Sequence, residues 1–385
     1  MTNLSIKNFL PEQYEATSEL EINHNYLQDQ FSDYQDILQK VGRVVERGDF
    51  TLGRAVEEFE HRYAGIIGTK HAVGVGSGTD ALFLSLKALG VGPGDEVITT
   101  PFTFFATIGA IVTAGATPVF VDVRADYNID TSKIEAAITN KTKVILPVHW
   151  SGKPCEMRQI EEIAEKYDVQ VVEDACHAIA ASINGKGAGS FGAFGCFSMH
   201  PLKNLNVWGD GGIACTNSDE LADKLRLMRN HGLVGRDHCH MFAYNSRLDT
   251  IQAVIADHLL DKIGDITRSR IENAKMLDER LRGLDQVTVQ NRDLERIKQV
   301  YHIYSLCFEK RDELQKYLIN NGVDAKIHYP IPMHLQPAAK KYGHQVGDFP
   351  IAEEIANTTL SLPVHEFIGE KHIEKMASLI KGFYG

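Results

Sequence analysis

The sequence predicts an α/β fold, with a mostly parallel central sheet covered by helices and a smaller C-terminal α+β domain. Two observations predict it. Short runs rich in Val and Ile alternate with helical segments between residues 71 and 230, as expected for parallel strands that are buried on both faces. Beyond residue 260, a long amphipathic segment leads into short apolar runs and further helices. The chain of 385 residues is long enough for about two domains of ordinary size.

We expect three regions along the chain: an N-terminal arm with one helix over residues 1–48, a large domain over 49–259 and a small domain over 260–385. Residues 1–35 are polar and acidic with little periodicity, and we interpret them as an arm that lies on a surface or a partner. Apolar residues at helical spacing predict the first helix over Tyr34–Arg47, and a second amphipathic helix follows the next turn.

The large domain opens with a strand, a glycine-rich turn and a helix, in the stretch HAVGVGSGTDALFLSLKALG. Gly76 and Gly78 allow the backbone to approach an anion, and the first N–H groups of a helix that begins at Thr79 carry partial positive charge. This pattern predicts a phosphate seat. A helix that is simply capped by Ser77 or Thr79 explains the same residues equally well.

The next strand runs into the aromatic segment TPFTFFAT, which contains Phe104; core packing would explain any single Phe there. The runs PVFVDV, KVILPVH and VQVVEDAC are three more strands, and we expect helices between them over Ser132–Thr139 and Met157–Tyr167. His149 and Trp150 follow the fourth strand. They could face a site at the strand ends, or Trp150 could anchor a loop.

The stretch from Val171 to Gly212 organises the rest. It holds three short apolar runs that read as buried strands, and each is followed by polar or glycine-rich sequence. The runs are Val169–Val172, Ala193–Phe197 and Ile213–Cys215. Asp174 ends the first strand, with His177 three residues on, and Ser198 ends the second, with Lys203 five residues on. Strand ends hold side chains rigidly beside open loops, where α/β enzymes build their sites.

An acid, a hydroxyl and a lysine in this arrangement favour pyridoxal phosphate chemistry. The Lys203 amine would form a Schiff base with the cofactor aldehyde, while Asp174 would pair with the pyridinium nitrogen. Ser198 could donate to the phosphate, and His177 could pack near the ring or bond its phenolic oxygen. Each residue is ambiguous alone, since most loop lysines are solvated and an aspartate at a strand end is more often a helix cap. The combined spacing carries the hypothesis.

The remaining elements complete the two domains. A helix over Glu220–Asn230 precedes a long loop, RNHGLVGRDHCHMFAYNSRLDTIQA, whose length inside a compact domain indicates a function. We expect one long amphipathic helix over Leu260–Leu284 to link the domains. The small domain should contain strands at VTVQ, VYHIYSLCF and DAKIHYP, and helices over Arg311–Asn320, Ile351–Thr358 and Lys371–Lys381.

Composition excludes several classes of function. The net charge of −11, from 40 basic and 51 acidic residues, gives no electrostatic support for nucleic-acid binding. No apolar run approaches the ~20 residues that span a membrane, and the N-terminus does not resemble a signal peptide. The six scattered cysteines are typical of reduced thiols in a cytoplasmic protein. We expect no metal at His238–Cys239–His240, because alternate residues in an extended loop rarely converge on one ion.

From about residue 40 to its end, the chain resembles the DegT/DnrJ/EryC1/StrS family, the sugar aminotransferases of the fold-type I pyridoxal phosphate enzymes. The resemblance rests on several motifs in the same order, and no single one of them carries it. The motifs are GSGTDAL at Gly76–Leu82, TPFTFFAT at Thr100–Thr107, EDACHA at Glu173–Ala178, SMHPLKNLNVWGDGG at Ser198–Gly212, YNSRLDTIQA at Tyr244–Ala253 and HYPIPMHLQP at His328–Pro337.

The resemblance implies roles for individual residues. Gly78 and Thr79 would contact the cofactor phosphate, and Phe104 would stack on the pyridine ring. Asn245 would bind the phosphate in the neighbouring subunit's site, which implies a homodimer with shared active sites, and Arg247 would bind a carboxylate or phosphate, for which its planar fork is suited. The residues that could line a sugar pocket are His328, Tyr329 and His334, although an ordinary Pro-rich connection also explains that segment.

The resemblance also implies the activity. We expect an aminotransferase that moves an amino group from an amino acid, L-glutamate by expectation, to a keto-sugar by a ping-pong Schiff-base mechanism. The KNL and GDGG sequences favour a nucleotide-linked 3-keto hexose. A cyclitol (keto-inositol) aminotransferase is the alternative within the family. Lys203 counts against the related dehydratases, which carry histidine there, and the lack of a basic DNA-binding segment counts against a sugar-sensing regulator. Met199 and His200 depart from the family pattern, which leaves the sugar open.

Overall fold

The computed structural model describes residues 20–290 and 292–385. Its centre is a seven-stranded sheet with the strand order β1-β9-β8-β5-β4-β2-β3, in which only β9 runs antiparallel to its neighbours. The predicted mostly parallel sheet is therefore confirmed. The strands are β1 (His71–Val75), β2 (Glu96–Thr99), β3 (Thr117–Phe120), β4 (Thr142–Ile145), β5 (Gln170–Asp174), β8 (Phe194–Ser198) and β9 (Gly212–Thr216).

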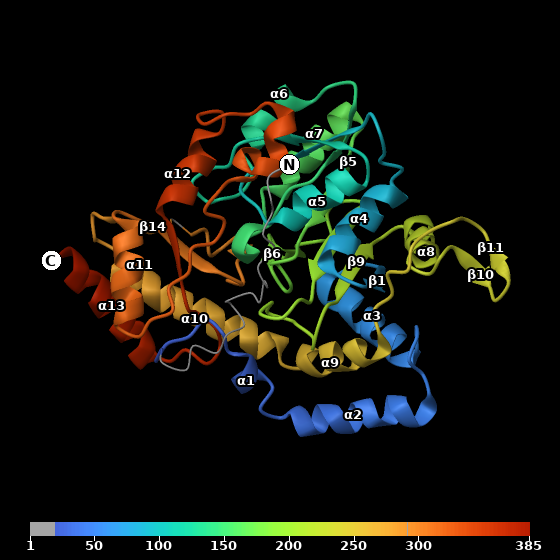
Figure 1. Ribbon diagram of the computed structural model, residues 1–385, viewed down its shortest axis with the longest axis horizontal. Helices are drawn as coiled ribbons and strands as arrows, with labels where there is room; N and C mark the ends of the chain where they lie inside the picture. Colours follow the sequence, from blue (N-terminus) through green and yellow to red (C-terminus); the bar gives the residue numbers. More distant parts are fainter. Residues whose placement is uncertain (1–19, 291) are drawn as a thin grey trace, which may run out of the picture.

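Helices cover both faces of this sheet (Figure 1). Neighbouring residues of β5 show why, because their side chains point to opposite faces: Val172 packs with α4, α5 and α8, whereas Val171 packs with α7. The β1 end of that second face is covered by α3 and α9. The bounds are α3 (Arg54–Ile67), α4 (Gly78–Ala88), α5 (Phe105–Thr113), α6 (Ile134–Ala137), α7 (Met157–Tyr167), α8 (Asp219–Met228) and α9 (Thr250–Leu260).

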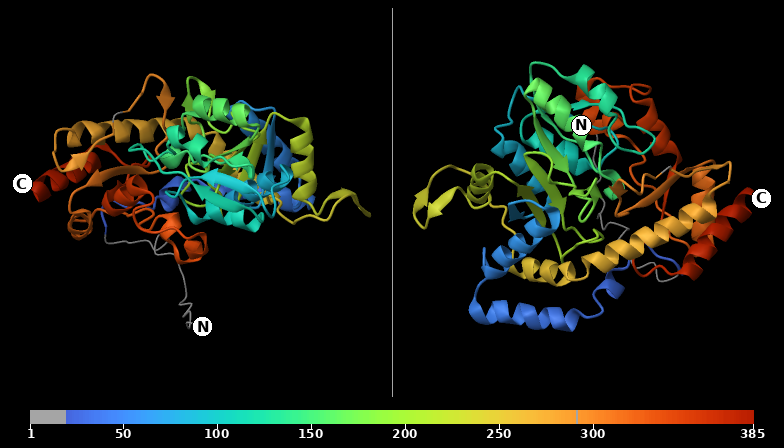
Figure 2. Two further views of the ribbon diagram at one scale, coloured as in Figure 1. Left: turned by 90° about the horizontal axis from the view of Figure 1, so that it is seen from above. Right: turned by 180° about the vertical axis from the view of Figure 1, so that it is seen from behind.

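A second, smaller sheet lies beside the first in all three views (Figures 1 and 2). It is antiparallel, with the order β12-β14-β15, and packs with the helices α10, α11 and α13 around its own apolar cluster. The predicted α+β character of this part is confirmed. The bounds are β12 (Val287–Thr288), β14 (Tyr304–Phe308), β15 (Thr359–Leu362), α10 (Ile263–Leu281), α11 (Arg311–Asn320), α12 (Pro350–Thr358) and α13 (Glu370–Tyr384).

The strand expected at DAKIHYP is wrong. Lys326 pairs with Ser361 of β15 at a single bridge, and the pairing goes no further. Two residues of this segment explain the interruption. Tyr329 adopts a left-handed backbone with φ of 56°, and Pro330 follows it without an N–H to donate to a ladder. The chain therefore turns away from the sheet as an irregular loop.

Two helix predictions also need correction. The single helix expected over Leu260–Leu284 consists of two helices, since α9 ends at Leu260 and α10 begins at Ile263. The Lys262 N–H bonds to the carbonyl of Leu259, three residues back, so the chain tightens between them. The helix expected over Ser132–Thr139 is shorter, because a 3-10 turn precedes the four residues of α6.

Residues 20–47 lie on the body of the protein. The predicted helix Tyr34–Arg47 is α2, with the same bounds, and it runs along α9 (Figure 1). Before it comes the short helix α1 (Leu27–Gln30), and the chain from residue 20 to α1 lies between the two sheets' domains. The first part of the predicted arm, residues 1–19, is outside the described residues.

Two smaller hairpins extend from the large domain. The strands β6 (Ser182–Ile183) and β7 (Lys186–Gly187) form a short hairpin, and β6 pairs with β13 (Ile297–Lys298). The strands β10 (Leu233–Gly235) and β11 (His238–Cys239) form an arm that projects away from the body (Figures 1 and 2). All six cysteines are unpaired. No helix in the described part of the chain is both long enough and apolar enough to cross a membrane.

Candidate cofactor and substrate site

A cavity of about 420 Å³ lies at the carboxyl ends of β5 and β8, between the large and small domains. Apart from Asn245, every residue predicted to bind the cofactor lines it, and so do two of the predicted sugar-pocket residues. The topology of the sheet explains this meeting, because parallel neighbouring strands end at the same edge. The predicted residues on its wall are Gly78, Thr79, Phe104, Asp174, His177, Ser198, Lys203, His328 and Tyr329.

Asp174 is the last residue of β5, and its carboxylate is buried on the cavity wall. One oxygen accepts a hydrogen bond from the Thr107 hydroxyl at 2.7 Å, and the other accepts one from the backbone N–H of Cys176 at 3.2 Å. Within residues 20–290 and 292–385, no Lys, Arg or His makes an ion pair with it. A buried carboxylate is costly without a cation, so this wall suits a ligand that brings a protonated ring nitrogen.

Lys203 lies on the loop that joins β8 to β9, and its amine reaches the same cavity. Burial lowers the pKa of Lys203, although the nearby Cys176 and Asp174 oppose that shift. A lowered pKa leaves more of the amine neutral and therefore nucleophilic near pH 7. The Lys203 carbonyl accepts a hydrogen bond from the Asn206 side chain at 2.8 Å, which holds the loop in place.

The N-terminus of α4 forms another part of the wall. Ser77 caps this helix by accepting a hydrogen bond from the N–H of Asp80 at 3.1 Å, and α4 itself begins at Gly78. Glycine is required there, because a Cβ at Gly78 would lie 2.6 Å from the Cβ of Ser198. Capping by Ser77 and phosphate binding at this helix end are thus compatible. The cap orients the helix, while its first N–H groups and Ser198 remain on the cavity wall for an anion.

The rings of His177 and Phe104 also line the cavity. His177 accepts a hydrogen bond at Nδ1 from the N–H of Ser151 at 3.3 Å, so its proton is on Nε2. Burial and the neighbouring Lys203 hold the pKa of His177 well below its usual value, so the ring is neutral. Phe104 is 52% exposed and belongs to none of the apolar cores, so its ring face is open to a flat ligand.

The residues expected to bind the sugar are divided. His328 lines the cavity and bonds to the Ser361 hydroxyl through Nδ1 at 2.7 Å, and burial lowers its pKa to about 3. Tyr329 lies beside it, and burial raises the pKa of its phenol. His334 does not line the cavity. Its Nε2 lies 3.0 Å from a carboxylate oxygen of Glu353, and its ring packs against Phe349.

Asn245 and Arg247 lie elsewhere, on the loop that leads into α9. Asn245 is exposed and pairs through its backbone with Asn230. Arg247 donates to the side-chain oxygen of the same Asn230 at 3.0 Å. Neither residue lines the cavity of its own chain.

His149 and Trp150, which the sequence leaves open, both have structural positions. Trp150 is 1% exposed and stacks on Phe102 at 5.4 Å, so it anchors its loop. His149 is fully buried, and its Nε2 donates to a carboxylate oxygen of Glu173 at 2.8 Å, because Nδ1 accepts from the N–H of Cys155.

Sequence reasoning missed several residues of the cavity wall. They come from the N-terminal segment, from α10 and from the small domain. No short-range signal marks them, because only tertiary contact brings them to the cavity. They include His24, Tyr26, Arg270, His302, Lys326 and His365.

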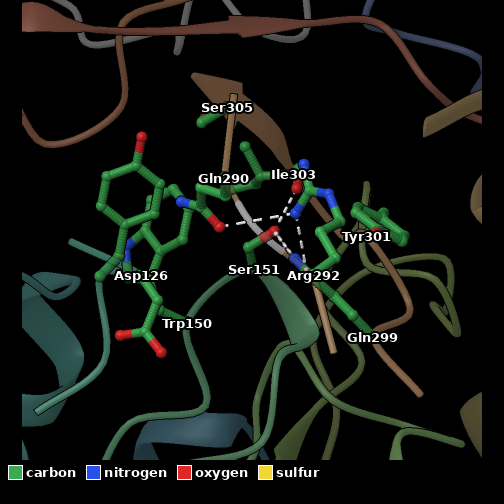
Figure 3. Close-up of a pocket in the computed structure, with 10 residues that line it drawn as sticks. Asp126, Trp150, Ser151, Gln290, Arg292, Gln299, Tyr301, Ile303 and Ser305 are labelled. Atoms are coloured by element: carbon green, nitrogen blue, oxygen red, sulfur yellow. Dashed lines mark hydrogen bonds between the residues drawn. The ribbon is translucent and has the colours of Figure 1, made fainter. Parts of the chain in front are cut away.

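A second, smaller pocket has mostly polar residues on its wall (Figure 3). Arg292 pairs there with the Asp278 carboxylate and donates to Gln299 at 3.2 Å, and Gln299 donates to Ser151 at 3.3 Å. The ring N–H of Trp150 has no partner among the described residues. This pocket joins the two domains but holds none of the predicted site residues.

The fold and the first cavity define an α/β enzyme with a half-buried lysine and a buried carboxylate on one wall. The profile of the DegT/DnrJ/EryC1/StrS aminotransferase family matches residues 32–381. The chain therefore belongs to this aminotransferase family, as the resemblance predicted. The predicted fold class and enzyme class are confirmed with it.

Two curated relatives and one solved structure illustrate the similarity. The UDP-N-acetyl-3-dehydro-α-D-glucosamine 3-aminotransferase of Acidithiobacillus ferrooxidans is 42% identical over 348 residues, 90% of this chain and 93% of that one. A pleiotropic regulatory protein of Geobacillus stearothermophilus is 40% identical over 354 residues, 91% and 94% of the two chains. The crystal structure of S. venezuelae DesV in complex with a ketimine intermediate has a TM-score of 0.91 at 35% identity, covering 94% of this chain and 98% of that one.

Proposed function

We propose that this protein is a pyridoxal phosphate-dependent aminotransferase that moves the amino group of L-glutamate to a nucleotide-linked 3-keto hexose. The observation that carries the proposal is that one cavity is lined by three groups. It brings the Lys203 amine, the Asp174 carboxylate and the N-terminus of α4 to one wall. These are the three groups that an aldehyde, a ring nitrogen and a phosphate on one cofactor require.

When bound, pyridoxal phosphate supplies an aldehyde for a lysine amine to attack and a ring that accepts an electron pair. The chain supplies the rest. The α4 N-terminus and Ser198 would bind the phosphate, and the exposed face of Phe104 would orient the ring. Asp174, held by Thr107 and the N–H of Cys176, would keep the proton on the ring nitrogen.

Lys203 would be the acid–base group once its amine is free. Its lowered pKa would allow the neutral amine to take the proton from Cα of the amino donor. The same amine would then deliver a proton to the carbon on the other side of the transferred nitrogen. His177, neutral and with its proton on Nε2, can donate to an oxygen on the cavity side. Donor and acceptor would use this one cavity in turn, which is ping-pong chemistry.

Two observations support a nucleotide-linked 3-keto sugar as the acceptor. The chain carries the KNL and GDGG sequences, and a 42% identical relative is named for 3-amination of a UDP-linked 3-dehydro sugar. His328 and Tyr329 on the cavity wall would contact the sugar. His334 would act at one remove, by supporting the loop that carries them, because it lies outside the wall.

We also propose that the active unit is a homodimer with shared sites. The positions of Asn245 and Arg247 support it, since both lie outside the cavity of their own chain. Asn245 would bind the partner's cofactor phosphate, and Arg247 a carboxylate or phosphate of the substrate in the partner's site. The six unpaired cysteines agree with the expected cytoplasmic location.

Absorption spectroscopy tests the first half-reaction. The purified protein, supplied with pyridoxal phosphate, should show a visible band that L-glutamate bleaches and that Lys203→Ala lacks. A band that glutamate leaves unchanged would contradict glutamate as donor. If no band formed even with added cofactor, the cofactor assignment would be wrong.

A substrate comparison tests the second half. With the amino group loaded from glutamate, a UDP- or dTDP-linked 3-keto hexose should restore the band at least 100-fold faster than a keto-inositol. A preference for the keto-inositol would favour the cyclitol alternative. One relative is named a regulatory protein. If this protein bound the cofactor but turned over neither substrate, the result would favour a sensor function.

A further inference from the structure

His302 is a half-buried histidine on the cavity wall to which the function above gives no task. It lies between β13 and β14 on the small-domain side, and its backbone N–H donates to the carbonyl of Ser151 at 3.1 Å. Its ring packs against His177, with 4.4 Å between the ring centroids. It is therefore fixed by the same large-domain turn that orients His177 through the Ser151 N–H.

The contact that matters is with Lys203. The His302 Nε2 lies 3.5 Å from the Lys203 Nζ, at the outer limit of a hydrogen bond. A lysine ammonium has only donors, so toward that form of Lys203 the Nε2 atom is the acceptor and the ring proton is on Nδ1. The Nδ1 atom has no hydrogen-bond partner among the described residues, so nothing else fixes the ring in a different tautomer.

The surroundings keep this imidazole neutral. Burial and the cations nearby hold the pKa of His302 well below its usual value. Its Nε2 lone pair is thus present wherever the enzyme is folded near neutral pH. The titratable groups that face Lys203 from the packed elements are Asp174, Cys176, His177, His200, His302 and His328.

We infer that His302 is a positioning residue for Lys203. Its Nε2 accepts a hydrogen bond from the free lysine amine and holds that amine at the wall of the cavity, where the donor's Cα proton must be taken. This inference rests on the proposed role of Lys203. It assigns His302 no contact with the cofactor or the substrate.

The left-handed turn at Ser151 provides the rigidity that such a role needs. Ser151 has φ of 59°, and its hydroxyl donates to the carbonyl of Ile303, next to His302. Its carbonyl and N–H bind the two histidine positions, at His302 and His177 respectively. Ser151 therefore positions both imidazoles. Its own hydroxyl accepts a hydrogen bond from Gln299, which lines the polar pocket of Figure 3.

Three variants of the holoenzyme test the inference. His302→Gln keeps an acceptor near the position of Nε2, His302→Asn keeps one only near Nδ1, and His302→Met keeps none. The measurement is exchange of the glutamate Cα proton with deuterated solvent, followed by NMR. We expect exchange to fall about 10- to 100-fold in His302→Asn and His302→Met, within the usual contribution of general acid–base catalysis. His302→Gln should stay within about 3-fold of wild type, and half-saturation by glutamate should not change.

A second measurement does not depend on turnover. The rate at which the cofactor-free enzyme takes up pyridoxal phosphate is measured against pH, and it reports the fraction of neutral Lys203 amine. An acceptor stabilises the ammonium form, so its removal in His302→Met should move the midpoint to lower pH. His302→Gln should keep the wild-type midpoint. Circular dichroism melting compares the folding of the three variants.

The outcomes separate this inference from the function beneath it. Reduction of the wild-type holoenzyme with borohydride, followed by peptide mass mapping, shows which lysine carries the cofactor. A tag on a residue other than Lys203 would overturn the proposed function. A tag on Lys203 together with wild-type exchange in His302→Met would overturn the role of His302 alone. Equal losses in His302→Gln and His302→Met would also overturn it, because they would indicate a packing role.

Discussion

At the scale of single residues, two neighbouring acids at the end of β5 have opposite tasks. Asp174 lines the cavity, whereas Glu173 points to the other side of the strand, as alternation requires. Glu173 is fully buried and accepts four hydrogen bonds. The donors are His149 Nε2 at 2.8 Å and the backbone N–H groups of Gly189 at 2.7 Å, Phe191 at 2.7 Å and Gly192 at 2.9 Å. It therefore ties the loop before β8 to β5.

Replacing Glu173 should destabilise the protein without touching the cavity wall. In Glu173→Gln, an NH2 group replaces one of the two carboxylate oxygens. This group cannot accept hydrogen bonds, so the buried donors on that side lose their partner. We expect the free energy of unfolding to fall by about 2–4 kcal/mol, measured by urea denaturation. The exposed Glu58→Gln, which breaks a surface ion pair with Arg54, should cost less than about 1 kcal/mol. Equal losses would contradict the assigned role.

His365 provides a test of pH dependence. It is buried, its Nε2 donates to the carbonyl of Asn23 at 2.8 Å, and burial lowers its pKa to about 3. The unfolded chain binds this proton near pH 6.5 and the folded chain only near pH 3, so stability falls as the pH drops through that window.

In His365→Gln the acid slope should be shallower. Between pH 6 and 4, the free energy of unfolding should change by about 1.4 kcal/mol less per pH unit than in wild type. Urea denaturation at a series of pH values measures the slope. At pH 7.5 to 8.5, above the window, the two slopes should coincide. An unchanged slope between pH 6 and 4 would contradict a neutral buried His365.

At the scale of elements, the site depends on close backbone packing between α4 and two strands. A Cβ at Gly212 of β9 would fall well inside contact distance of the Ser77 carbonyl and the Gly78 nitrogen. Both neighbours are backbone atoms at the start of α4, so no side chain can give way. The proposed phosphate seat thus requires glycine in the strand that supports it as well as in the turn.

Gly212→Ala should therefore weaken cofactor binding. We expect the dissociation constant for pyridoxal phosphate to rise at least 10-fold and the free energy of unfolding to fall by about 1–3 kcal/mol, the usual cost of overpacking. Fluorescence titration and urea denaturation measure the two effects. Gly109→Ala in α5 is the matched control, because nothing lies within 4 Å of its added Cβ. A Gly212→Ala variant that binds like Gly109→Ala would contradict this packing argument.

The loop that carries Lys203 is a second case at this scale. The Tyr26 hydroxyl donates to the carbonyl of Leu202 at 3.0 Å, and Leu202 itself has a left-handed backbone with φ of 73°. The side chain of Asn206 bridges Gln30 and the Lys203 carbonyl. The segment before α2 thus restrains the lysine loop, although almost 180 residues separate them in sequence.

At the scale of the whole molecule, the cavity is built from three parts of the chain. The large domain supplies the predicted cofactor residues, the small domain supplies His302 and His328, and the N-terminal segment supplies His24 and Tyr26. The proposed dimer would add a fourth part from the partner's loop. That addition is open to a direct test.

Mixing two inactive variants should restore activity if sites are shared. One variant is Lys203→Ala, and the other is Asn245→Ala combined with Arg247→Ala. A mixed dimer would have one complete site, with its own Lys203 and the partner's intact loop. After subunit exchange at equal amounts, about a quarter of all sites should be active, given random pairing in a two-fold dimer. Steady-state assays before and after exchange measure it, and activity that stays at the mean of the two variants would contradict sharing.

The local pattern of the sequence was enough to determine much of this protein. Periodicity predicted Tyr34–Arg47, Met157–Tyr167 and Arg311–Asn320 with the bounds that the structure has. The placement of Asp174, Ser198 and Lys203 after strands predicted that they would meet, because neighbouring parallel strands end at one edge. The family resemblance rested on the same motifs.

Only the tertiary structure decided the rest. It placed His334 outside the cavity and His302 beside Lys203, and it gave Trp150 an anchoring position. It left a single bridge at Lys326 in place of the strand expected at DAKIHYP. The physical reason is sequence distance. The periodicity of a strand or helix depends on residues that are close in sequence, whereas burial and hydrogen bonding across a cavity depend on which distant segments pack together. The same local sequence can lie inside or outside such a cavity, so only the packing of distant segments decides which contacts form.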